Sequence, residues 1–154
     1  MIKSFRQFLT ESSDSLKTKV VDEFGEPLLM YHGGSYKSGE FLGAGWFTSS
    51  KKDATYYAKQ NYGVVTKAYL DIKNPFYVGQ IEHLNILPTE KLLISAERRR
   101  YTIKTNEEGF IKFIEPNVGV LIAQDLGRDG VIDLYQGKII DAVIFNNKQI
   151  ILVK

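Results

Sequence analysis

Four aromatic or imidazole side chains between residues 32 and 57 have the types and spacing to enclose a ligand. His32 follows an apolar run and precedes two glycines, so the backbone there can approach a ligand closely. Trp46 and Phe47 follow a second glycine-containing stretch, and Tyr57 comes ten positions after Phe47 on an expected helix. The electron-rich faces of such rings stack on planar and on cationic groups. The pattern therefore predicts a cleft for a flat aromatic ligand.

Composition narrows the classes of function. The 154 residues are 44% hydrophobic, which indicates one domain of ordinary size with a real core. The net charge of +2 is too small to argue for nucleic acid. The absence of Cys excludes disulfides, thiolate zinc sites and a Cys nucleophile, and with only His32 and His83 we expect no catalytic metal site. No stretch has the character of a membrane span or a secretory signal, so we expect a soluble protein of a reducing compartment.

The order of the motifs resembles the ADP-ribosyltransferase fold of the diphtheria-toxin and poly-ADP-ribose-polymerase type. In that family His-Gly closes the first core strand, a helical Tyr follows a Phe by ten positions, and a late acidic residue precedes a Gln by eight. His32 before glycine, the pair Phe47 and Tyr57, and the pair Asp141 and Gln149 fit this frame. The resemblance covers roughly residues 20–153 and is closest to small domains of phage proteins.

The resemblance implies that NAD is the substrate and that the NAD-binding residues lie in the first half of the chain. His32 would bind a ribose hydroxyl on the adenosine side, and Gly33 would hold the nicotinamide carboxamide by its backbone N–H and C=O. Tyr57 would stack on nicotinamide. Trp46, where the family commonly has Tyr, would form part of the opposite wall, and Phe47 would pack inward beside it.

The resemblance also assigns the catalytic residues as His32, Tyr57 and Asp141. The Asp141 carboxylate would stabilise the positive charge that develops on ribose as its bond to nicotinamide breaks. The family usually has the longer Glu, so either the backbone lies closer here or the site is weaker. Asp133 is the reserve acid, and Tyr56 is the weaker choice for the stacking ring. The residue two positions before Asp141 is an isoleucine, so the paired-acid motif of arginine-directed toxins is lacking.

Residues 1–16 form an expected arm, separate from a transferase-like domain at 17–154. The placing of Phe5, Phe8 and Leu9 suits a frayed amphipathic helix. Residues 1–11 also resemble the short, basic, Phe-rich capsid-targeting leaders of phage internal head proteins, which a prohead protease cuts after a Glu such as Glu11. That resemblance implies the prohead core and its protease as partners, and a location in the virion interior and then in the host cytoplasm.

The expected fold class is α+β, and the resemblance implies a split pair of small antiparallel sheets around an NAD cleft with peripheral helices. Strands are expected at residues 28–31, 64–72, 131–134, 142–145 and 149–153, the last two as a tight hairpin. Helices are expected at 51–61 after Ser50, at 88–100 with Thr89 as N-cap, and as two short pieces of 107–126 interrupted at Pro116.

The function indicated by the resemblance is a mono-ADP-ribosyltransferase that modifies a host protein or RNA and is packaged in a phage head. Two alternatives stay open: an NAD glycohydrolase relative that transfers to water, and a non-enzymatic internal head protein with a decayed transferase fold. The His, Tyr and acid set is present apart from Asp for Glu, which favours the transferase. The run Arg98-Arg99-Arg100 is either a solvated helix end or a contact surface for an acidic target or for RNA phosphates.

Overall fold

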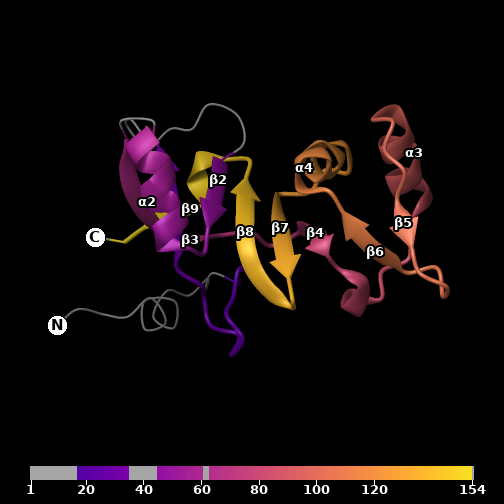
Figure 1. Cartoon of the computed structure of the whole chain (residues 1–154), viewed down its shortest axis with the longest axis horizontal. Coiled ribbons are helices and arrows are strands. Elements are labelled where there is room, and N and C mark those ends of the chain that lie inside the picture. The colour runs from indigo at the N-terminus through magenta and orange to yellow at the C-terminus, as the bar shows by residue number, and fades with distance from the viewer. Residues whose placement is uncertain (1–16, 35–44, 61–62, 154) are drawn as a thin grey trace.

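A computed structural model describes residues 17–34, 45–60 and 63–153, so the arm predicted for residues 1–16 lies outside the described residues. Within these residues, nine strands and three helices make an α+β domain (Figure 1). The strands are β1 Met30–Gly34, β2 Gly45–Thr48, β3 Val64–Leu70, β4 Pro75–Gln80, β5 Lys104–Thr105, β6 Ile111–Ile114, β7 Gly130–Tyr135, β8 Lys138–Ile144 and β9 Ile150–Leu152. The helices are α2 Lys51–Gln60, α3 Glu90–Arg98 and α4 Pro116–Asp125, with single turns η1 Glu82–Leu84 and η2 Asn147–Gln149.

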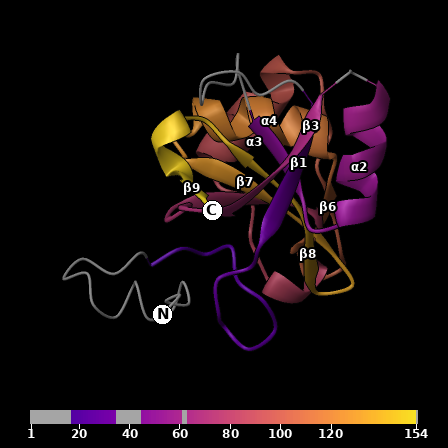
Figure 2. The ribbon, with the colours of Figure 1, turned by 90° about the vertical axis from the view of Figure 1, so that its left-hand side faces the viewer.

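The strands form one mixed, strongly twisted sheet in the order β5-β6-β4-β7-β8-β2-β1-β3-β9 (Figure 2). Neighbours are antiparallel except for β4 and β7. The expected split into two sheets is not confirmed, because β8 pairs with β2 along four residues and with β7 on its other side. The weakest junction is between β1 and β2, which are in register at Tyr31 and Thr48 alone.

The hydrophobic core follows the middle of this sheet. In β7 every residue from Gly130 to Leu134 is buried, because both faces of the strand are covered. Phe47 of β2 and Met30 of β1 are among the largest side chains that are fully buried. No helix in the described part of the chain has the length and the apolar character needed to cross a membrane.

Two helix starts confirm the predicted caps. The Ser50 hydroxyl accepts a hydrogen bond from the Asp53 N–H at 3.1 Å, directly before α2. Thr89 is extended and accepts from the Leu92 N–H at 3.2 Å at the start of α3. In each case a side-chain oxygen satisfies a backbone donor that the helix itself leaves unpaired.

The prediction of two short helices within residues 107–126 is half wrong. Its first part is the strand β6, whose buried residues Ile111 and Ile114 have a spacing of three that also suits a helix face. Pro116 does not interrupt a helix but begins α4, where the missing N–H costs nothing.

The predicted hairpin between residues 142–145 and 149–153 is also wrong. β9 pairs with β3 at the end of the sheet, away from β8. The Gln149 side chain accepts from the N–H groups of Phe145 and Asn146 at 3.0 and 2.9 Å. Its amide also donates to the carbonyl oxygens of Asp71 and Asp129 at 3.0 and 2.7 Å. These four bonds turn the chain away from β8, so the Gln that follows Asp141 by eight positions has a structural role.

Candidate active site

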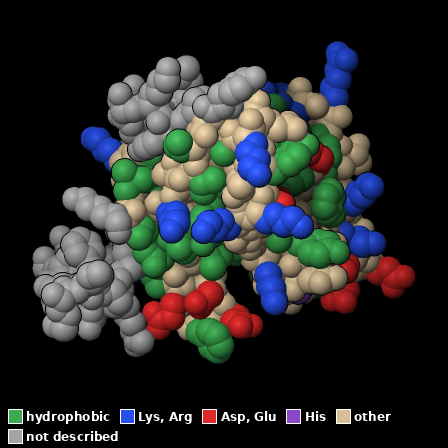
Figure 3. All heavy atoms as spheres, turned by 60° about the vertical axis from the view of Figure 1, so that its left-hand side comes forward, with side chains coloured by type: hydrophobic (Ala, Val, Ile, Leu, Met, Phe, Trp, Pro, Cys, Tyr) green, Lys and Arg blue, Asp and Glu red, His purple; other side chains and the backbone are tan. Residues whose placement is uncertain are grey.

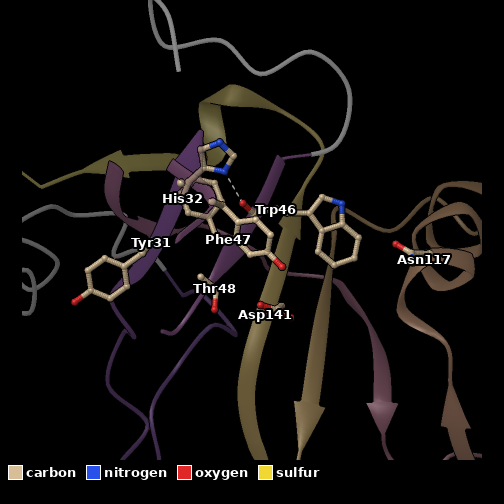
Figure 4. Close-up of a pocket in the computed structure, with 9 residues that line it drawn as sticks. Tyr31, His32, Trp46, Phe47, Thr48, Asn117 and Asp141 are labelled. Carbon is tan, nitrogen blue, oxygen red and sulfur yellow. Dashed lines mark hydrogen bonds between the residues drawn. The ribbon is translucent and has the colours of Figure 1, made fainter. Parts of the chain in front are cut away.

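A pocket of about 380 Å³ opens over β1, β2 and β8, which lie side by side in the sheet. Tyr57 of α2 and Asn117 of α4 also line it, and Figure 4 shows Asn117 at one side of the pocket. Its volume lies in the range of small-molecule sites. All of the residues that the sequence analysis assigned to catalysis or to the NAD site line this one pocket. They are His32, Gly33, Trp46, Phe47, Tyr57 and Asp141.

Close backbone packing forms the wall of the pocket between β1 and α2. A Cβ atom on Gly33 would lie 1.7 Å from the carbonyl oxygen of Ala54, so no larger residue fits there without moving the helix or the strand. Ala54 and Ala58 are buried on the same face of α2. This approach brings Tyr57 to the pocket, where its ring is 55% exposed and meets the ring of Tyr56 edge-on at 5.7 Å.

The imidazole of His32 occupies the place where β1 and β2 diverge. Its Nδ1 lies 2.6 Å from the carbonyl oxygen of Trp46, and because a carbonyl can only accept, Nδ1 carries the hydrogen. A neutral His32 therefore presents Nε2 as a hydrogen-bond acceptor. The ring is also tilted against Phe47, with 5.4 Å between centroids. Phe47 itself is 1% exposed, so it mainly supports the imidazole from within the core.

The strand expected at residues 142–145 would begin just after Asp141. In the structure, Asp141 lies instead in the middle of β8. It is paired with Thr48 of β2 on one side and with Asp133 of β7 on the other. Directly paired residues project from the same face of a sheet. Burial raises the pKa of Asp141, the neighbouring Thr48 hydroxyl lowers it, and the negative charge of Asp53 raises it, so that the net direction is upward. The Thr48 hydroxyl itself donates to the carbonyl oxygen of Ile140 at 3.3 Å.

The reserve acid Asp133 is in a different environment from Asp141. It is 6% exposed and is not among the residues that line the pocket. A Cβ on Gly79 would lie 2.3 Å from its Oδ1, so its carboxyl group lies against β4. Burial, and then the negative charges of Asp141 and Glu115, raise the pKa of Asp133 to about 6. Of the two acids, Asp141 is the one that faces the cavity.

Three further residues line the pocket and were missed by the sequence analysis: Tyr31, Thr48 and Asn117. Tyr31 and Thr48 pair with each other, and Thr48 also pairs with Asp141, so they form one row across the sheet. Asn117, in the first turn of α4, reaches the pocket only because that helix packs over β4 and β7. No spacing pattern in the sequence predicts that these three residues line the pocket.

A comparison with protein-family models matches residues 22–153 to a family described as ADP-ribosyltransferase in polyvalent proteins. No curated protein and no solved structure matches the chain. The family match spans most of the 154 residues, including every residue of the pocket. The chain therefore belongs to this family of ADP-ribosyltransferase domains.

Proposed function

We propose that the protein is a mono-ADP-ribosyltransferase that takes ADP-ribose from NAD. The observation that carries the proposal is that His32, Tyr57 and Asp141, from three different elements, line one pocket in a chain of this family. An imidazole acceptor, an aromatic face and a carboxylate are the groups needed to bind a nicotinamide nucleotide and to stabilise a ribosyl cation.

The wall formed by β1 and α2 suits the binding of NAD. His32 can accept a ribose hydroxyl at Nε2, because its other nitrogen is fixed on the Trp46 carbonyl. Gly33 lies just beyond the single pair that joins β1 to β2, where its backbone N–H and C=O can hold the planar carboxamide. The exposed face of Tyr57 can stack on the cationic nicotinamide ring.

Asp141 supplies the charge for the chemical step. As the bond between ribose C1′ and nicotinamide breaks, its electron pair leaves with nicotinamide and C1′ becomes cationic. The carboxylate, which lies beside Thr48 in the sheet, accepts a hydrogen bond from the ribose 2′-OH and stabilises this charge. A nucleophile of the acceptor then bonds to C1′ and loses a proton.

The experiment that tests this function is incubation of the purified chain with NAD labelled in its ADP-ribose part and with bacterial lysate. We expect label on a macromolecule, and separate analysis of protein and RNA identifies its class. Asp141→Asn is the control and should abolish the label. Release of nicotinamide without any labelled macromolecule would indicate a glycohydrolase. If neither nicotinamide release nor label is detected, the result would indicate a non-enzymatic role.

We propose in addition that the protein is packaged in a phage head and enters the host cytoplasm with the DNA. The support is the short, basic, Phe-rich character of residues 1–11 and the Leu9-Thr10-Glu11 sequence at their end. Mass spectrometry of protein from purified particles should then find Ser12 as the first residue. Particles that contain the chain with Met1 intact would argue against this processing.

A further inference from the structure

The pocket has a second side beyond Asp141, which the NAD contacts proposed for His32, Gly33 and Tyr57 do not include. Trp46, which the resemblance assigned to the wall of the NAD site, lies on this side (Figure 4). Trp46 and Thr48 project from the same face of β2, and Thr48 is paired with Asp141. The indole and the carboxylate are therefore diagonal neighbours, with backbones about 7 Å apart. Asn117 of α4 lies on the far side of Trp46 from His32 (Figure 4). These three side chains outline a space beside Asp141, the residue proposed to act on the reacting carbon (Figure 4).

The charge around this space is negative. Asp141 lines it, and the carboxylates of Asp53 and Glu115 act on Asp141 and on the neighbouring Asp133 respectively. Among the described residues, no Lys or Arg lines the pocket. This is a local property, because the chain carries a net charge of +2 and cationic side chains are spread over the face seen in Figure 3. The space therefore favours a cation over an anion.

The start of α4 reinforces this preference. The Glu115 carboxylate accepts from the backbone N–H groups of Asn117 and Val118 at 3.1 and 2.9 Å. The Tyr101 hydroxyl in turn accepts from the Glu115 N–H at 2.9 Å, which fixes the cap. The helix end is thus already occupied by a carboxylate and offers no free donors to a phosphate or a carboxyl group.

We propose that the acceptor of ADP-ribose is a guanidino group, as in an arginine side chain, held between Trp46 and Asn117 beside Asp141. This inference rests on the proposed function. A guanidinium is planar and cationic, so it can stack on the indole while it donates to the Asp141 carboxylate and to the Asn117 side-chain oxygen. An ammonium group lacks the plane and the paired donors. Position 139, two before Asp141, is an isoleucine and supplies no second acid. The further carboxylates near Asp141 are those of Asp133 on β7 and of Glu115 at the start of α4.

The reaction that follows is a substitution at C1′ of the NAD ribose. The bond from C1′ to nicotinamide breaks and nicotinamide takes the electron pair. A guanidino nitrogen, approaching from the side of Trp46 and Asn117, forms the new bond to C1′. That nitrogen passes one proton to the Asp141 carboxylate, which releases it to water. The products are nicotinamide, the ADP-ribosylated guanidinium, which keeps its positive charge, and one proton.

The acceptor class can be tested with small molecules. The purified full chain is incubated with NAD and either agmatine, which carries a guanidino group, or cadaverine, an alkyl diamine of similar length, or glutarate. We expect ADP-ribosyl-agmatine by mass spectrometry and faster nicotinamide release with agmatine. We expect the rate with cadaverine or glutarate to stay at the level without acceptor.

Asn117→Ala tests the place of binding. It should raise KM for agmatine about tenfold while it changes KM for NAD by less than about twofold, because it removes one charge-assisted hydrogen bond to the acceptor. Gln124→Ala is the matched control, since Gln124 is an exposed amide near the opposite end of α4. It should leave both KM values unchanged.

The outcomes separate this inference from the proposed function. Protein or RNA labelling in lysate without any agmatine product would overturn the guanidino acceptor and leave the transferase standing. Equal products with cadaverine, or an unchanged KM for agmatine in Asn117→Ala, would overturn the inference in the same way. No nicotinamide release and no labelling in any arm would overturn the proposed function together with the inference.

Discussion

The two walls of the pocket are built on different physical principles. The wall of β1 and α2 depends on shape: Gly33 lets the helix backbone rest on the strand, and the Trp46 carbonyl fixes His32. The wall of β8, β7 and α4 depends on charge: Asp141 faces the cavity while Asp133 is buried beside it. The first wall tolerates no added volume, and the second contains charge that destabilises the fold. This contrast is consistent with the proposed function, in which the first wall binds NAD and the second acts on the developing cation.

The largest effect is expected from removing the charge of the second wall at the pocket. Asp141→Asn keeps the size and the hydrogen-bonding capacity of the side chain, so NAD should still bind. Loss of one preorganised electrostatic contact should lower kcat by about 10²- to 10³-fold with little change in the Kd of NAD. Steady-state rates of nicotinamide release, together with calorimetric titration of NAD, measure the two quantities.

A second acid variant checks this assignment. If Asp141→Asn kept full activity and Asp133→Asn lost it, the catalytic charge would belong to β7 and the contrast between the buried and the facing acid would be wrong. Asp141→Glu then reports the distance to the substrate. Retained or higher activity indicates the usual backbone position of the family, and lower activity indicates that β8 lies closer to the ribose.

The next largest effect concerns the shape of the first wall. Gly33→Ala would place a methyl group 1.7 Å from the Ala54 carbonyl oxygen, so α2 must move away from β1. We expect a loss of about 3 kcal/mol in the free energy of unfolding and weaker NAD binding. Gly127→Ala is the control, because nothing lies within 4 Å of its Cβ and its positive φ of 69° should cost only about 1 kcal/mol. Urea unfolding measures both, and equal losses would mean that the close approach at Gly33 is not limiting.

Replacing Asp133, the buried acid of the second wall, should stabilise the fold, whereas Gly33→Ala should destabilise it. The pKa of Asp133 is raised from 3.8 to about 6 in the folded protein, so the folded state binds its proton more tightly than the unfolded chain. Its contribution to the free energy of unfolding therefore falls by up to about 3 kcal/mol as the pH rises from 3.8 through 6. Asp133→Asn removes the charge and should raise Tm at about pH 8 but not at about pH 3, where both forms are neutral.

Asp125→Asn is the control with the opposite sign. The hydrogen bond from Ser95, and then the one from Arg99, hold the pKa of Asp125 below its usual value. Its contribution to stability is thus present at neutral pH and is lost as the pH falls through the folded pKa, so this substitution should lower Tm at neutral pH. A rise of Tm in both variants would mean that net charge, rather than burial, explains the Asp133 result. The same contact gives Arg99 a structural role between α3 and α4.

The sequence predicted the first wall better than the second for a physical reason. A close backbone approach requires glycine and small residues at fixed spacing, as at Gly33. His32 and Tyr57 lie in the same local stretch of the sequence, so their spacing could be recognised. Thr48 and Asn117 reach the pocket through strand pairing and helix packing, which follow from long-range contacts. The acid itself could be found through the resemblance, but its place in the middle of β8 could not.

The errors in the predicted secondary structure also arise from long-range contacts, which the local sequence does not show. The Ile111 and Ile114 spacing fits a helix face equally well, and only pairing with β4 and β5 decides for a strand. The hairpin failed because four hydrogen bonds of one side chain, Gln149, compete with the local turn. The α+β class is confirmed, since it depends on the number and type of elements and not on which strands pair.

The smallest effect separates binding from catalysis on the first wall. Tyr57→Ala removes the ring proposed to stack on nicotinamide, and the loss of one cation–aromatic contact should weaken NAD binding about tenfold while kcat changes little. Tyr56→Ala is a close control, because Tyr56 is exposed to a similar extent on the same helix but is not among the residues that line the pocket. It should leave the Kd of NAD within about twofold, although the edge contact between the two rings is lost. If Tyr57→Ala lowered kcat as strongly as Asp141→Asn and left the Kd unchanged, the ring would act on the transition state, and the division into a binding wall and a charge wall would fail.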